Sequence, residues 1–263
     1  MTTAPSIARS STRSTSPCRL PELSGLEISA QFREPRSGGD FFDFAFSPSH
    51  FAFVLTDIAG ERSTAQGVAA EVQEAFQHHA AKYIVDDADF NEAEATVALL
   101  HAVNRAIMSS SGGVRCAPTF LGTYNLALHT LTYIGAGAPA ALLLSNGEVR
   151  VLESNGIPLG LFTHLTHDPL PLALEPASRL VLLSKGVLER RHRGEEFGMS
   201  RVRELLLMHQ TSSAYDLSSE ILNAAETYGA SGNHLGPRIH LPRFHHDSDT
   251  DDMTVVTMAR DAN

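Results

Sequence analysis

The sequence has no tryptophan and only two cysteines among its 263 residues. Cys18 and Cys116 cannot build the disulfide framework of a small secreted domain, so we expect a reducing compartment, the cytoplasm. Long apolar runs are missing too, and none approaches the roughly 20 residues that a membrane-spanning helix needs. These absences predict a cytoplasmic protein with no membrane partner.

Positive charge is also scarce. Lys and Arg number 20 against 30 Asp and Glu, which gives a formal net charge of -10. Nucleic acids and anionic membranes select for basic surfaces, so we expect no nucleic-acid partner. The excess of carboxylates is instead compatible with metal cations, provided that the acids cluster.

The first 20 residues differ in composition from the rest of the chain. Nine of them are Ser or Thr, three are Arg, and none is acidic. Such a segment buries too little apolar surface to offset the entropy of ordering it. Its composition resembles an organelle transit peptide, but it lacks an amphipathic apolar face. We therefore predict a disordered tail over residues 1–20 and one folded domain over residues 21–263.

Hydrophobic periodicity predicts grouped helices rather than helices that alternate with strands. Apolar residues recur at helical spacing in four segments, 64–84, 90–109, 200–209 and 216–228. Short β-prone runs predict strands at 26–33, 51–55, 121–129, 131–135, 140–144, 148–152, 179–184 and 253–258. Ser145-Asn146-Gly147 is a hairpin turn signal, because Asn-Gly tolerates positive φ. With roughly ten strands and four helices, the fold class is α+β with antiparallel sheet.

Two acidic motifs lie close to predicted strands. Asp57 follows the apolar run 51–55, and an ionised carboxylate there either faces a charge or lies at the surface. Asp40 and Asp43 follow Gly38-Gly39, whose glycines let the backbone turn sharply. The alternative for this second motif is a turn with a solvated acid, so both motifs are candidates only.

A third acidic motif, Asp247 to Asp252, directly precedes the last predicted strand. Its carboxylates repel one another, so they are exposed or share a cation. Three histidines lie just before it: His240, His245 and His246. A cluster of His and Asp side chains over residues 234–252 is able to ligate zinc or a similar metal. A hydrated acidic loop is the commoner outcome for such a stretch.

Taken in order, these motifs resemble a known family. The chain is similar to the PPM-type (protein phosphatase 2C-like) Ser/Thr phosphatases, in the bacterial branch named after stage II sporulation protein E. The resemblance rests on residues 21–44, 54–60, 123–162, 179–191, 195–205 and 251–256. It implies two packed antiparallel β-sheets flanked by helices, an α-β-β-α sandwich.

The resemblance also implies a chemistry. Members of this family hold two Mn²⁺ or Mg²⁺ ions on a ring of aspartates and use a metal-activated water to hydrolyse phosphoserine or phosphothreonine. By motif, Asp57 matches the aspartate that bridges both ions, and the Ile58 carbonyl matches a backbone ligand. Asp251 matches the C-terminal metal aspartate, with Asp252 beside it. Asp40 matches an acid that holds water at the metals.

One departure from the family pattern alters the expected site. The family has a strand followed by Asp-Gly, whereas this chain has Ser184-Lys185-Gly186. A protonated lysine has no acceptor for a cation and repels one. We therefore predict that Lys185 substitutes for one metal and that fewer than two ions bind. The alternative is that Lys185 points outward and a nearby acid replaces the lost ligand.

Other departures are smaller. Gly60-Glu61-Arg62 stands where the family has Gly-Lys-Gly, and Ala138 stands where it has a histidine. The basic run Arg190 to Arg193 is able to bind phosphate or an acidic partner, although a solvated loop is the simpler interpretation.

Two functions remain open from the sequence. The first is a phosphatase acting on a phosphoprotein regulator, a partner that the resemblance suggests is of the anti-sigma-factor antagonist type. The second is a catalytically impaired pseudophosphatase that binds a phosphoprotein or regulator without turnover, because Lys185 replaces a metal-ligand aspartate.

Overall fold

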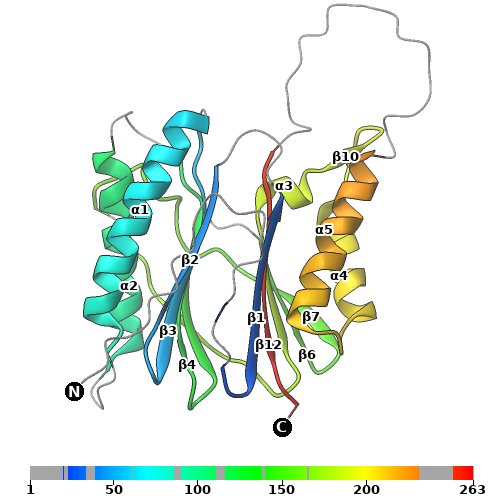
Figure 1. Ribbon diagram of the computed structural model, residues 1–263, viewed down its shortest axis with the longest axis horizontal. Coiled ribbons are helices and arrows are strands. Elements are labelled where there is room, and N and C mark those ends of the chain that lie inside the picture. Colours follow the sequence, from blue (N-terminus) through cyan, green and yellow to red (C-terminus); the bar gives the residue numbers. More distant parts are fainter. Residues whose placement is uncertain are drawn as a thin grey trace, which may run out of the picture.

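The computed structural model describes residues 20, 23–33, 39–60, 62–85, 90–110, 116–137, 140–164, 166–230 and 251–262. Residues 1–19 of the predicted tail, Ala138 and the histidine-rich stretch before Asp251 therefore lie outside the described residues. Two five-stranded antiparallel sheets pack face to face, and pairs of helices cover their outer faces (Figure 1). This confirms the α+β class and the four-layered sandwich that the sequence predicts.

The first sheet has the strand order β1-β12-β9-β6-β7. Its strands are β1 (Leu26–Arg33), β6 (Ala140–Ser145), β7 (Glu148–Leu152), β9 (Arg179–Leu183) and β12 (Met253–Arg260). The helices α4 (Gly198–Met208) and α5 (Ala214–Ala230) cover its outer face, and the single-turn helix α3 (Lys185–Leu188) follows β9. A two-stranded hairpin, β10 (Arg191–His192) and β11 (Glu195–Glu196), connects α3 to α4.

The second sheet has the strand order β2-β3-β4-β5-β8. Its strands are β2 (Asp40–Phe46), β3 (His50–Asp57), β4 (Thr119–Asn125), β5 (Thr130–Ala136) and β8 (Leu170–Ala173). The helices α1 (Arg62–Tyr83) and α2 (Glu92–Ser109) cover its outer face. None of the helices in the described part of the chain is long and apolar enough to cross a membrane.

Side-chain alternation divides the core into three layers. In β9, Leu180 and Leu182 face the other sheet, whereas Val181 and Leu183 face α4 and α5. Both faces of this strand are therefore buried, which is why its sequence is apolar without alternation. The layer between the sheets is rich in phenylalanine, and Phe51 and Phe53 are completely buried within it.

Several element boundaries differ from the prediction. The segment 40–46 is the strand β2 rather than a turn, and β4 ends at Asn125 instead of reaching residue 129. Asn125 ends the strand because its side-chain Oδ1 accepts hydrogen bonds from the backbone N–H groups of Ala127 and Leu128. The predicted hairpin turn is confirmed, with positive φ at both Asn146 and Gly147.

Candidate functional site: an acidic end of the sandwich

The two sheets bring their acidic residues to the same end of the sandwich. β2 begins at Asp40 and β3 ends at Asp57, and these two residues are direct Cα partners in the ladder. In the other sheet, Asp251 and Asp252 directly precede β12. Asp40 links the sheets, since Thr254 Oγ1 donates to Asp40 Oδ2 at 2.7 Å and Asp40 N donates to Asp252 Oδ2 at 3.4 Å.

Two glycines allow the backbones to approach closely at this end. A Cβ atom on Gly39 would lie 2.9 Å from the Ile58 carbonyl oxygen and 3.4 Å from Asp57 Oδ1. A Cβ atom on Gly186 would lie only 2.0 Å from the Asp252 carbonyl oxygen. Glycine is therefore required where α3 meets the start of β12. Gly39 belongs to the Gly-Gly-Asp motif, and Gly186 follows Lys185 in the segment that departs from the family pattern.

The carboxylates at this end perturb one another. Burial, together with the charges of Asp57 and Asp252, raises the pKa of Asp40 well above its usual value, although hydroxyl groups of Ser184 and Thr254 oppose the shift. Burial raises the pKa of Asp57 to about 6, and the negative charges of Asp251, Asp252 and Glu189 add to it. The end of the sandwich is thus short of positive charge.

Lys185 supplies part of the missing positive charge. Its ammonium lies close enough to Asp57 to lower the pKa of that carboxyl, against the stronger effect of burial. Lys185 Nζ also forms an ion pair at 3.4 Å with Oε2 of Glu189, the residue that directly follows α3. From the sequence we expected Lys185 among the acids and did not predict its ion pair with Glu189. The four-residue spacing fits an ion pair along a helix, but no helix was predicted at Lys185.

The donor set at this end suits a hard divalent cation. Mg²⁺ is commonly bound by one or two carboxylates while it keeps several waters, and Mn²⁺ also prefers oxygen ligands. Asp57, Asp251 and the Ile58 carbonyl fit that pattern. Within the described residues, no three His, Cys, Asp or Glu side chains already surround one point closely enough to hold a metal.

Asp43, the other acid of the Gly-Gly-Asp motif, is not part of this site. It is buried beneath α1, where it accepts hydrogen bonds from Gln77 Nε2 at 2.8 Å and from the Phe44 backbone N–H at 2.9 Å. Gln73 Nε2 approaches the same carboxylate at 3.4 Å. Burial raises the pKa of Asp43, and these donors oppose the shift. Asp43 therefore connects β2 to α1 rather than facing a ligand.

The basic run is structured rather than a free loop. Arg191 pairs with Glu196 at 2.7 Å across the β10–β11 hairpin. Arg193 and Gly194 form its turn with positive φ. The histidines His240, His245 and His246 and the acid Asp247 lie outside the described residues.

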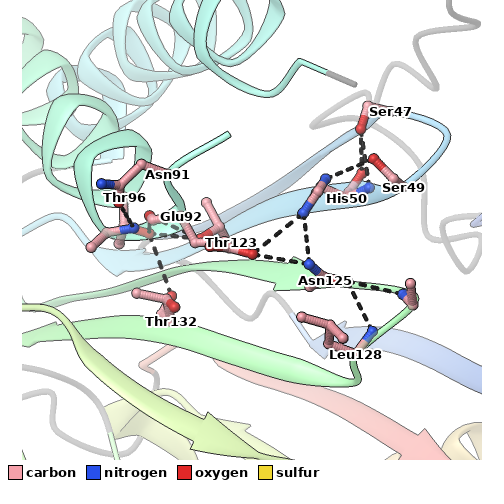
Figure 2. Close-up of polar contacts among 12 residues, drawn as sticks. Ser47, Ser49, His50, Asn91, Glu92, Thr96, Thr123, Asn125, Leu128 and Thr132 are labelled. Atoms are coloured by element: carbon pink, nitrogen blue, oxygen red, sulfur yellow. Dashed lines mark hydrogen bonds and ion pairs between the residues drawn. The ribbon is translucent and has the colours of Figure 1, made fainter. Parts of the chain in front are cut away.

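A second polar cluster lies at the opposite end of β3 (Figure 2). Asn125 Nδ2 donates to His50 Nε2 and to Glu92 Oε1, both at 3.0 Å. Because Nε2 accepts, we assign the ring proton to Nδ1, which donates to Ser49 Oγ at 2.7 Å. Ser49 thus receives a hydrogen bond rather than losing a proton to the ring. No pattern in the sequence predicted this cluster, and its geometry indicates a structural role.

The architecture and the acidic end define the class of protein as a PPM-type phosphatase domain. The family model of stage II sporulation protein E (SpoIIE) matches residues 47–261, so the chain belongs to the SpoIIE family.

Two curated relatives are similar in sequence. Protein IcfG of Synechocystis is 27% identical over 228 residues, covering 79% of this chain and 35% of IcfG. Phosphoserine phosphatase RsbU of Bacillus subtilis is 22% identical over 209 residues, covering 78% of this chain and 59% of RsbU. The chain thus spans roughly a third to three fifths of the length of these relatives.

A solved structure shares the fold. The crystal structure of the RsbU and RsbW domains of Rv1364c from Mycobacterium tuberculosis superposes with a TM-score of 0.71 at 21% identity. The match covers 92% of this chain and 63% of that one.

Proposed function

We propose that this domain removes phosphate from a phosphoserine or phosphothreonine of a regulatory protein. The observation that supports it most is the convergence of Asp40, Asp57, Asp251 and Asp252 at one end of the two sheets. A relative named phosphoserine phosphatase supports the substrate class. By the family resemblance, the partner would be a small regulator of the anti-sigma-factor antagonist type.

A cation is required for phosphate to enter this end at all, because carboxylates repel a phosphate dianion. Asp57, Asp251 and the Ile58 carbonyl would hold one Mn²⁺ or Mg²⁺, with Asp252 next to them. When bound, the ion would act as a Lewis acid on the phosphate and lower the pKa of a water nucleophile. Asp40, positioned by Thr254 Oγ1, would orient that water for in-line attack.

A second function is favoured by Lys185. Its ammonium is able to contact a phosphate but not to ligate a metal, and its charge already acts on Asp57. A site that keeps one cation and one ammonium would bind a phosphorylated side chain without efficient hydrolysis. The domain would then act as a phosphoprotein-binding module, that is, a pseudophosphatase.

Hydrolysis of p-nitrophenyl phosphate and of a phosphoserine peptide in Mn²⁺ separates the two functions. Wild type, Asp57→Ala and Lys185→Asp are compared, with Asp43→Asn as the control because Asp43 is a buried acid outside the site. Wild-type turnover that Asp57→Ala abolishes and Asp43→Asn retains would support the phosphatase. A silent wild type whose activity appears only in Lys185→Asp would support the binding module and contradict hydrolysis by the natural protein.

A further inference from the structure

The end of β3, the residues before β4 and the loop after β7 lie side by side next to the acidic end. The backbone N–H of Asp57 donates to the Pro118 carbonyl at 2.9 Å. One residue further out, Ala117 and Leu159 form an antiparallel bridge, with backbone hydrogen bonds of 2.9 and 3.0 Å between them. The loop that carries Leu159 is therefore joined by hydrogen bonds to the segment that pairs with Asp57.

Side chains in these three segments alternate between two faces. One set is almost completely buried in the core beneath α1 and α2: Ile58, Ala117 and Leu159. Because successive side chains of an extended chain point to opposite faces, the residues next to this set face the other way. These residues are Asp57, Pro118 and Pro158, so the two prolines continue the face on which Asp57 lies.

The loop that carries Pro158 is anchored at two points. Gly137 has a φ of 61° and packs so closely on Pro158 that a Cβ atom at Gly137 would collide with the proline ring. On the other side, Asn104 of α2 is buried and accepts at Oδ1 from the Gly160 backbone N–H at 2.8 Å. Ile157, which directly precedes Pro158, is 47% exposed on this anchored loop.

Pro118, Pro158 and Ile157 thus form an uncharged surface, here called the proline strip, that leads away from Asp57. We propose that the proline strip receives an apolar side chain of the phosphoprotein segment whose phosphate lies at the acidic end. This inference rests on the proposed function, in which phosphate enters that end. Ile157 is then a specificity-determining residue and not a catalytic one.

The spacing of the backbones determines which substrate residue reaches the strip. Neighbouring strands lie about 4.8 Å apart, so Pro158 is about 10 Å from the Asp57 backbone, with Pro118 between them. An extended peptide advances about 3.3–3.6 Å per residue, so the residue about three positions from the phosphoserine lies at the strip. An apolar side chain is favoured there, because contact with the strip removes apolar surface of both partners from water.

Two phosphoserine peptides that are otherwise identical test the proposal in the presence of Mn²⁺. One has Leu about three residues to either side of the phosphoserine, and the other has Gln at both places. Wild type should prefer the Leu peptide about tenfold, in kcat/KM where it is hydrolysed and in affinity by fluorescence anisotropy where it is only bound. Ile157→Gln should reduce this ratio to about twofold or less, whereas the conservative Ile157→Leu should retain it. The ratio compares two peptides on one preparation, so partial unfolding of a variant does not mimic the result.

The matched control is Val151→Gln, because Val151 is also β-branched and is 42% exposed, on the edge strand β7 of the other sheet. It should retain the preference of wild type. Equal use of the two peptides by wild type, or a preference that persists in Ile157→Gln, would overturn the proposal. A changed oligomeric state of Ile157→Gln with the preference retained would also overturn it, and would assign the strip to a second copy of this chain.

The proposal and the proposed function fail in different ways. Equal hydrolysis of both peptides, abolished by Asp57→Ala, would support the function and refute the role of the proline strip. A Leu preference in binding that depends on Ile157, in a protein without turnover, would support the strip and refute hydrolysis. The absence of both binding and turnover for the two peptides would refute both.

Discussion

The two ends of strand β3 both carry buried polar groups, yet they are built on opposite principles. Asp57 lies at one end and His50 at the other, roughly 23 Å apart at the usual rise of a strand. Around His50, the polar side chains are hydrogen-bonded to their neighbours, and the amide of Asn125 alone makes four hydrogen bonds. Around Asp57, burial and the neighbouring carboxylates together raise the pKa values of Asp40 and Asp57.

This difference separates a structural cluster from a functional one. A polar group satisfied by its neighbours adds to stability and leaves nothing for a ligand. A group of like charges destabilises the fold until a ligand of opposite charge binds, which is what we expect of the proposed cation site. Substitutions at the two ends of β3 should therefore have opposite effects.

The largest effect should come from Asp57→Asn. We expect Mn²⁺ affinity to fall at least about 100-fold, since a central charged ligand is lost. In metal-free buffer at pH 7, however, this variant should be more stable than wild type by about 1–2 kcal/mol, because a repelled, partly buried charge is gone. Calorimetric titration and urea unfolding in EDTA measure the two effects. A less stable Asp57→Asn would show that the acids do not repel one another.

Asn125→Ala should produce the opposite result. It leaves Glu92, His50 and the turn after β4 without their shared partner, so we expect a loss of about 2–3 kcal/mol in unfolding free energy. Mn²⁺ affinity should be unchanged, because the two ends of β3 are far apart. Urea unfolding and Mn²⁺ titration of the same preparation check both halves. Weakened Mn²⁺ binding would contradict the independence of the two ends.

Gly186→Ala should affect both stability and the site, but less strongly. The new methyl group would collide with the Asp252 backbone, and relieving that contact should cost about 1–2 kcal/mol. The displaced α3 and β12 should also weaken Mn²⁺ binding. Gly147→Ala is the control for stability alone, because nothing lies near its Cβ position although φ is positive. Equal Mn²⁺ affinities in the two variants would argue against a fixed α3.

The smallest effect should be a pH dependence at Asp43. Burial raises its pKa in the folded protein, so its contribution is most favourable when it is protonated and is lost as pH rises through the folded pKa. Asp43→Asn cannot ionise, so it does not lose stability in this way as the pH rises. The stability of Asp43→Asn relative to wild type should therefore increase as the pH rises above about 4, the ordinary pKa of an aspartate side chain. A difference that is constant or falls with pH in metal-free urea unfolding would refute this assignment.

The sequence predicted most of the fold because most of its signals are local. The apolar run of β9 and the Asn146-Gly147 turn need no tertiary information, and the family motifs located the acids. β2 was missed because Gly38-Gly39 indicates a turn just where the strand begins. β8 was missed because Leu170–Ala173 is a short edge strand that contains Pro171, which favours edges and weakens the strand signal.

The polar contacts were predicted less well because they depend on packing. His50, Glu92 and Asn125 come from three separate elements, and no spacing in the sequence connects them. Glu189 lies four residues after Lys185, but the pairing is informative only once α3 is known to be a helix that faces Asp57. Sequence motifs therefore located the acids, whereas the structure identified which charges oppose them.

The number of Mn²⁺ ions that the protein binds shows whether Lys185 takes the place of a metal. Titration calorimetry of the full chain and of Lys185→Asp, at one pH and one salt concentration, gives both stoichiometries. We expect one ion at the acidic end of the natural protein and two in the Lys185→Asp variant. Two tight ions in the natural protein would show that Lys185 does not take the place of a metal.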